Sequence, residues 1–172
     1  MDAIQAIFSR RSVRHFRDEA VSEEQIELLL RAAMQAPSAA NGQPWHFVVI
    51  DEREKLDAIQ RFHPFAKALN EAPIAILVCG DARLETAPGR WIQDCSAATQ
   101  NLLLAAHASG LGAVWLGITP EPDRIEAISN LVGLPSGVHP LALVAVGHPI
   151  DATPPGAERY RPERVHRNAW RE

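Results

Sequence analysis

Residues 90–117 read RWIQDCSAATQNLLLAAHASGLGAVWLG, which predicts a long helix over residues 90–109 followed by a strand over residues 113–117. Gly110 stands just past the predicted end of the helix, where a C-cap favours glycine. Apolar and small residues occur on nearly every side of this helix and cannot share one stripe. Such a helix is buried on most sides, either as the central core helix of a monomer or against a partner subunit.

Helix and strand signals alternate on both sides of this stretch, without internal repeats. Ser22 and Gln25 form a capping box, which predicts a helix that ends before Pro37. The apolar runs at residues 46–51 and 74–79 predict two strands, both fully buried. The remaining predicted elements are short helices over residues 51–60 and 64–70, a helix after the Thr119-Pro120 start signal, and a last strand over residues 141–147.

Length and composition predict one globular unit. The chain has 172 residues, of which 47% are hydrophobic and 22% charged, so it is long enough for a core of its own. We expect a single domain over residues 1–172, in which residues 148–172 form an extended, arginine-rich tail because their prolines do not suit core structure. The net charge of -4 and the pI near 6.0 disfavour nucleic acid as the main partner.

Several other classes of function are disfavoured by what the chain lacks. No apolar run approaches the roughly 18 residues of a membrane span and no signal-peptide pattern is present, so we expect a cytoplasmic protein without a membrane partner. Cys79 and Cys95 have no CxxC or metal-ligand spacing, and we expect both to be buried as small apolar residues. The seven histidines form no HExxH pattern and no GxSxG occurs, which disfavours zinc and serine hydrolases.

Arginines gather near both ends of the chain. The first cluster is Arg10-Arg11-Ser12-Val13-Arg14, and the second lies between residues 159 and 171. Only Lys55 and Lys67 are lysines, and guanidinium groups form fixed, bidentate hydrogen bonds that suit a phosphate. Solvated surfaces, or an anion-binding interaction domain that meets nucleic acid or an acidic protein, are the alternative interpretations of the same clusters.

Four motifs stand in order along the chain. They are Arg10-Arg11-Ser12-Val13-Arg14, APSAANGQPW at residues 36–45, GLGAVWLG at residues 110–117, and Gly147-His148-Pro149. Together they resemble the flavin-dependent nitroreductase family, from about residue 4 to the C-terminus. The resemblance implies an α+β fold with a mixed, mainly antiparallel sheet flanked by helices. It also implies an intertwined homodimer with FMN at the subunit interface, in which the long apolar helix is the central packing surface.

The same resemblance implies which residues hold the cofactor. Those that match contacts to the flavin phosphate and to the polar edge of the ring are Arg10, Arg11, Ser12 and Arg14. Those that match residues supplied by the other subunit are Pro37, Ser38, Asn41 and Gln43. Further flavin contacts are matched by Asn70, Leu116 and Gly117, and basic residues that return to the phosphate are matched by Arg159 and Arg161. We expect no catalytic acid or base side chain and no metal.

The resemblance also implies the reaction, because FMN carries the redox chemistry in this family. NAD(P)H delivers a hydride to FMN and leaves before a small flat acceptor, a nitroaromatic, quinone or enone, takes its place. Consistently, Gly110-Leu111-Gly112 lacks the third glycine of a dinucleotide-binding motif. The short segment at residues 80–89 favours an open site. The alternative hypothesis is a non-catalytic FMN-binding or sensing protein.

Overall fold

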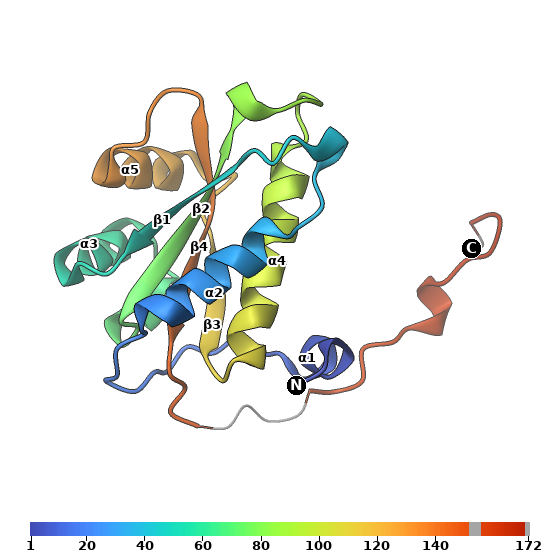
Figure 1. Cartoon of the computed structure of the whole chain (residues 1–172), viewed down its shortest axis with the longest axis horizontal. Helices are drawn as coiled ribbons and strands as arrows, with labels where there is room; N and C mark the ends of the chain where they lie inside the picture. The colour runs from blue at the N-terminus through green and yellow to red at the C-terminus, as the bar shows by residue number, and fades with distance from the viewer. Residues whose placement is uncertain (152–155, 171–172) are drawn as a thin grey trace.

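The computed structural model describes residues 1–151 and 156–170. These residues form a four-stranded sheet with helices packed against it (Figure 1). The strands are β1 Trp45–Ile50, β2 Ile74–Asp81, β3 Gly112–Gly117 and β4 Val138–Gly147. Their order is β1-β2-β4-β3, and each neighbouring pair is antiparallel. A parallel bridge between Ser12 and Ala113 adds the N-terminal segment to the free edge of β3.

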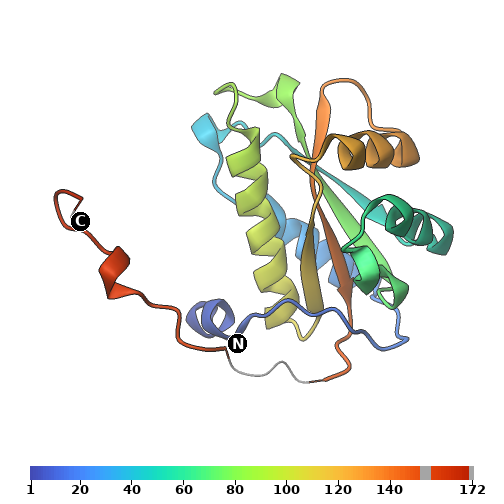
Figure 2. The same ribbon diagram turned by 180° about the vertical axis from the view of Figure 1, so that it is seen from behind.

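Helices cover both faces of the sheet. α2 Glu23–Met34 and α4 Trp91–Ala108 lie on one face, and α3 Arg53–Phe62 and α5 Pro122–Val132 lie on the other (Figure 1 and Figure 2). Side chains of β2 alternate between the two layers, with Ile76 in the core beneath α2 and α4 and Leu77 in the core beneath α3 and α5. The shorter elements are α1 Ala3–Ser9 and the 3-10 turns η1 Ala39–Asn41, η2 Ala66–Asn70, η3 Ala82–Leu84 and η4 Pro162–Arg164.

The start of α2 confirms the predicted capping box. Ser22 Oγ accepts a hydrogen bond from the backbone N–H of Gln25 at 3.3 Å, and the Gln25 side chain accepts one from the backbone N–H of Ser22 at 2.9 Å. These two bonds satisfy donors that the first turn of a helix leaves free.

One sequence prediction is wrong. β1 is not fully buried: His46 is exposed and the middle of the strand is half-buried, because β1 lies at the sheet edge and pairs only with β2. The helix predicted after the Thr119-Pro120 start signal is present and begins at Pro122. Proline suits the first helical turn, where its missing N–H costs no hydrogen bond, and Pro122 rather than Pro120 occupies that position.

The long helix α4 is covered on two sides by its own chain. Cys95, Ala98 and Leu102 are fully buried in the core that the helix forms with α2 and the sheet. Asn101 Nδ2 also donates to the backbone oxygen of Ala32 in α2 at 3.1 Å. A third side stays accessible, since Ile92 is 42% exposed and Leu104 is half-buried. The single chain therefore buries less of α4 than its composition predicts.

Both cysteines are free and buried, as predicted. Burial raises the pKa of the Cys79 thiol and that of the Cys95 thiol to about 12, so neither forms a thiolate at neutral pH. Within residues 1–151 and 156–170, no helix is both long and apolar enough to cross a membrane.

The C-terminal segment extends away from the body of the molecule (Figure 1 and Figure 2). No residue from 156 to 170 is buried. The rings of His166 and Trp170 stack with centroids 4.2 Å apart, and Trp170 is 81% exposed. This segment adds nothing to the core of its own chain, and the assignment of residues 1–172 to one domain stays a prediction.

Candidate active site

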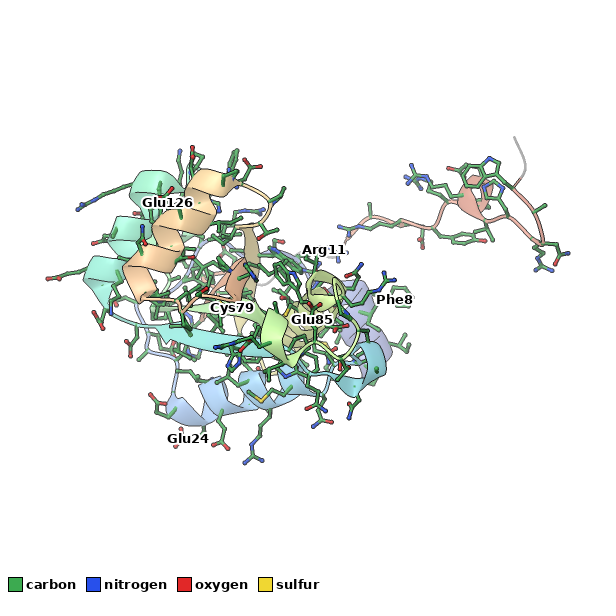
Figure 3. The ribbon with its side chains drawn as sticks, turned by 90° about the horizontal axis from the view of Figure 1, so that it is seen from above. Phe8, Arg11, Glu24, Cys79, Glu85 and Glu126 are labelled. Atoms are coloured by element: carbon green, nitrogen blue, oxygen red, sulfur yellow. The ribbon has the colours of Figure 1, made fainter. Side chains whose placement is uncertain are left out.

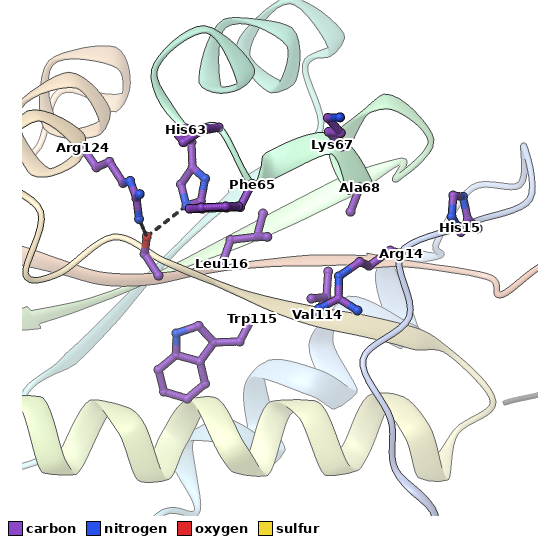
Figure 4. Close-up of a pocket in the computed structure, with 12 residues that line it drawn as sticks. Arg14, His15, His63, Phe65, Lys67, Ala68, Val114, Trp115, Leu116 and Arg124 are labelled. Atoms are coloured by element: carbon purple, nitrogen blue, oxygen red, sulfur yellow. Dashed lines mark hydrogen bonds between the residues drawn. The ribbon is translucent and has the colours of Figure 1, made fainter. Parts of the chain in front are cut away.

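A cleft of about 740 Å³ opens between β3 and the segment that joins α3 to η2 (Figure 4). We call it the β3 cleft. Val114, Leu116 and Gly117 of β3 form its floor, and Phe65 and Ala68 lie on the opposite wall. Leu116 and Gly117, both predicted as flavin contacts, therefore line the same cleft.

The titratable side chains around the β3 cleft are all basic. They are Arg14, His15, His63, Lys67 and Arg124. No carboxylate of the described residues lines the cleft, although the chain as a whole has a net charge of -4. An apolar floor with a positive rim suits a flat molecule that carries or develops negative charge.

Two side chains converge on the backbone carbonyl oxygen of Gly117 (Figure 4). His63 Nε2 lies 2.9 Å from this oxygen, and Arg124 Nη1 donates to it at 3.0 Å. His63 is buried, and burial, with a smaller effect of the Arg124 charge, lowers the pKa of its imidazole. The ring is therefore neutral at neutral pH. Its Nε2–H donates to Gly117, and Nδ1 is a buried acceptor without a partner among the described residues.

A second pocket, of about 720 Å³, lies beside the C-terminal end of α1. Arg10, Arg11 and Arg159 line it, so the fold brings together arginines from both ends of the chain. We call it the arginine pocket. Partial burial, followed by the charges of Arg11 and Arg159, lowers the pKa of the Arg10 guanidinium. A bound anion such as phosphate would offset this repulsion.

Arg11 lies where the tail meets the body of the protein. Its Nη1 donates to the backbone oxygens of Phe8 at 3.0 Å and Arg10 at 2.6 Å, at the end of α1. Its guanidinium also lies directly against Gly156, which leaves no room for a Cβ there. Figure 3 shows Phe8 and Arg11 on the side of the body from which the tail leaves. Arg161 does not line the arginine pocket, and its Nη1 donates to the backbone oxygen of Tyr160 at 3.2 Å.

One extended segment joins the two sites. The backbone N–H of Val13 donates to the oxygen of Ala113 at 3.0 Å, which holds the segment along β3. A Cβ at Gly112 would lie 2.7 Å from Val13 Cγ1, so glycine permits this close approach. Four residue steps of extended chain span about 13 Å. Arg10 therefore reaches the arginine pocket while Arg14 reaches the β3 cleft, with Ser12 between them.

Five other predicted site residues lie elsewhere in the single chain. Pro37, Ser38, Asn41 and Gln43 belong to the loop around η1, at the N-terminal end of α4, whereas α1 lies beside the C-terminal end of α4 (Figure 1). The 18 residues of α4 make it about 27 Å long. One chain therefore does not bring this loop to the arginine pocket. The fifth, Asn70, lines a third cleft together with Glu71 and does not line the β3 cleft.

Comparison with known proteins identifies the family. The sequence model of the nitroreductase family matches residues 7–74 and 60–148. The chain belongs to the nitroreductase family. A Methanothermobacter thermautotrophicus protein, provisionally named NADH dehydrogenase/NAD(P)H nitroreductase, is 46% identical over 170 residues, which are 99% of this chain and 88% of the relative.

Solved structures of nitroreductase relatives share the fold. A crystal structure from Parabacteroides distasonis, with the same provisional name, superposes with a TM-score of 0.93 at 42% identity and covers 97% of this chain and 98% of its own. A provisionally named nitroreductase from Desulfovibrio desulfuricans, solved in complex with FMN, superposes with a TM-score of 0.83 at 34% identity and covers 99% of each chain. These likenesses confirm the predicted family and the α+β fold with its antiparallel sheet.

The η1 loop of this member of the nitroreductase family has an unusual backbone. Ala40, Asn41 and Gln43 have φ angles of 48°, 55° and 49°, in the left-handed region that side chains other than glycine rarely adopt. Contacts around the loop maintain this conformation. Asp94 of α4 accepts a hydrogen bond from the backbone N–H of Ala39 at 3.0 Å, and Ser38 Oγ accepts one from the backbone N–H of Gln43 at 3.0 Å. The loop therefore presents its polar side chains in a fixed arrangement.

Asp94→Ala is expected to release the η1 loop. The Ala39 N–H loses its acceptor, which should lower the free energy of unfolding by about 1–3 kcal/mol. Chemical denaturation of wild-type protein and variant measures this difference. Asp94→Asn is the matched control, because its amide oxygen can still accept the bond and the loss should be smaller. Equal stability of Asp94→Ala and wild type would show that Asp94 does not hold the loop.

The residues of the β3 cleft that sequence reasoning missed include His63, Phe65, Lys67 and Arg124. Residues 63–67 read HPFAK and stand at the start of the short helix predicted over residues 64–70, a pattern that assigns them no role in a site. Arg124 lies in the first turn of the helix that follows β3, which could have drawn attention to it. No periodicity indicates that His63 and Arg124 meet at one carbonyl, because that contact joins distant parts of the chain.

Proposed function

We propose that the protein is an FMN-dependent oxidoreductase that passes electrons from NAD(P)H to a small flat acceptor such as a nitroaromatic, a quinone or an enone. The observation that carries the proposal is the extended segment of residues 10–14, in which Arg10 and Arg11 line the arginine pocket and Arg14 lines the β3 cleft. Family relatives support it, since the Methanothermobacter relative is named for NAD(P)H and the Desulfovibrio structure contains FMN.

The two sites fit the two ends of FMN. The clustered guanidinium groups of the arginine pocket suit a phosphate, and the apolar floor of the β3 cleft suits a flat ring. The residues that we assign to the phosphate are Arg10, Arg11, Ser12, Arg159 and Arg161. Those that we assign to the ring are Arg14, Leu116 and Gly117, with Pro37, Ser38, Asn41 and Gln43 supplied by the other subunit. Asn70 stays a predicted contact.

The β3 cleft contributes position and charge to the reaction. When bound, FMN would supply the redox chemistry, by which NAD(P)H, one proton and the acceptor would yield NAD(P)+ and the reduced acceptor, with water as a further product when the acceptor is a nitroaromatic. Arg14 offers a positive charge beside the ring edge, where negative charge develops on reduction. The Nε2–H of His63 is used in the hydrogen bond to the Gly117 oxygen. His63 therefore positions the backbone of Gly117 at the floor of the cleft. Because NAD(P)H and the acceptor share one cleft, they bind in turn.

The proposal includes a homodimer. Ile4, Ile7 and Phe8 of α1 are 62%, 51% and 74% exposed, and Ile7 and Phe8 line the arginine pocket. Apolar side chains gathered on one surface mark a protein interface. A second subunit that covers them could bring its η1 loop to the site that one chain leaves incomplete. We place the enzyme in the cytoplasm, where the free thiols of Cys79 and Cys95 stay reduced.

An anaerobic titration of the purified, FMN-loaded protein tests the proposal. We expect NADH or NADPH to bleach the visible flavin spectrum and a nitroaromatic or quinone to restore it, because each reactant uses the same cleft in turn. A flavin spectrum that neither nucleotide bleaches would favour the non-catalytic binding protein. Absence of FMN binding altogether would contradict the assignment of both arginine clusters.

A further inference from the structure

The β3 cleft carries more positive charge than the flavin assignment uses. Arg14 and Lys67 lie toward the Val114 end of the cleft, and Arg124 lies at the Gly117 end (Figure 4). A strand rises about 3.3 Å per residue, so these ends are about 10 Å apart. Arg14 is assigned to the edge of the flavin ring at the Val114 end. The flavin assignment therefore gives no ligand to Arg124.

Arg124 is half-buried, and only part of its hydrogen-bonding capacity is used within the chain. Its Nη1 donates to the oxygen of Gly117 at 3.0 Å, and no carboxylate of the described residues pairs with it. A guanidinium has five N–H donors in a planar fork that matches the two oxygens of a carboxylate. Arg124 therefore keeps donors for an anion that enters the cleft.

Phe65 provides an aromatic surface next to this cation. Its side chain is 71% exposed, and the guanidinium carbon of Arg124 lies 5.6 Å from the centroid of its ring. The buried imidazole of His63 packs edge-on against the same ring, with centroids 6.4 Å apart, and so fixes one side of it. An exposed phenylalanine on the wall of a cleft is a stacking surface for a flat ring.

We propose that Phe65 and Arg124 bind an aromatic electron acceptor that carries a carboxylate, with its ring against Phe65 and its carboxylate on the Arg124 guanidinium. This inference rests on the proposed function and adds the class of acceptor, anionic rather than neutral. The 2′-phosphate of NADPH is a second source of negative charge. This phosphate is on the ribose farthest from the nicotinamide, beyond the pyrophosphate, whereas Arg124 lines the cleft in which the ring reacts. The position of Arg124 therefore favours the carboxylate of the acceptor as its ligand.

The test measures the two half-reactions of the FMN-loaded enzyme separately. 4-Nitrobenzoate and 4-nitrobenzamide are matched probes, because they share a flat ring and differ in charge. Arg124→Met is expected to lower kcat/KM for 4-nitrobenzoate about tenfold through loss of a charge-assisted hydrogen bond. We expect the value for 4-nitrobenzamide and the rates of reduction by NADH and NADPH to change less than about twofold. Arg124→Lys keeps the positive charge but loses the two parallel N–H donors of the guanidinium. Its kcat/KM for 4-nitrobenzoate should therefore lie between those of wild type and Arg124→Met.

Arg61→Met is the control, because Arg61 is an exposed arginine of α3 that does not line the β3 cleft. This variant should leave kcat/KM unchanged for both 4-nitrobenzoate and 4-nitrobenzamide. Equal losses for both acceptors in Arg124→Met would overturn the proposal, since they would indicate that Arg124 only supports Gly117. A decrease confined to the rate of reduction by NADPH would also overturn the proposal, because it would indicate that Arg124 binds the 2′-phosphate of NADPH.

A second measurement needs no variant. Added KCl screens charge, so it should lower the preference of the wild-type enzyme for 4-nitrobenzoate over 4-nitrobenzamide. A preference that salt does not change would contradict the proposal even if Arg124→Met fails to fold. Failure of the proposed function would appear earlier and separately, as a protein that holds no flavin or whose flavin NAD(P)H does not reduce.

Discussion

Arg10→Met is expected to weaken FMN binding about 100-fold, because a charge-assisted, bidentate contact to a phosphate contributes about 2–3 kcal/mol. Methionine preserves most of the apolar stem of arginine and removes only the guanidinium. Titration of the apoprotein with FMN, followed by flavin fluorescence, measures the change in Kd. Arg31→Met in α2 is a suitable control, because Arg31 is an exposed arginine whose guanidinium pairs with Glu27 and which lines neither basic site.

The same variant has a second, opposite effect on the apoprotein. Burial and the charges of Arg11 and Arg159 lower the pKa of Arg10, so its positive charge is unfavourable while no anion is bound. Arg10→Met apoprotein should therefore melt at the same temperature as wild type or higher, while the rise in Tm on addition of FMN is largely lost. A variant apoprotein that melts well below wild type would show that Arg10 supports the fold rather than the cofactor.

Local sequence signals predicted the parts of the fold that depend on near neighbours. Ser22 and Gln25 are three residues apart, so their capping box can be recognised without knowledge of the rest of the chain. The prediction that β1 is buried failed because exposure depends on the neighbours of a strand in the sheet. The apolar sequence of β1 resembles that of β2, yet β1 lies at the edge and β2 lies between two partners.

The candidate site shows the same division. The composition of residues 10–14 suggested an anion clamp, with a solvated surface as the alternative, and the family resemblance assigned the segment to FMN. That Arg10 and Arg14 reach two different sites follows from the pairing of Ser12 and Val13 with Ala113 across β3, which no local pattern indicates. His63 and Arg124 meet at the oxygen of Gly117 for the same reason: a tertiary contact brings them together.

A mixture of two defective variants is expected to recover flavin binding that neither has alone. Arg10→Met damages the arginine pocket, and Asn41→Asp adds a negative charge to the η1 loop while keeping a residue type that tolerates its φ of 55°. If each site combines the arginine pocket of one chain with the η1 loop of the other, a mixed dimer has one intact site and one site with both defects. Random pairing makes about half of the dimers mixed, so about a quarter of the wild-type sites should return.

Co-expression of the two variants with different affinity tags, followed by purification on both tags in turn, isolates the mixed dimer. Its flavin content should be about half that of wild-type dimer, because one of its two sites is intact. A site built from a single chain predicts the opposite, since both sites of the mixed dimer would then carry one defect and neither would hold FMN tightly. The measurement therefore decides whether the length of α4, which keeps the η1 loop away from α1 within one chain, is bridged by a second subunit.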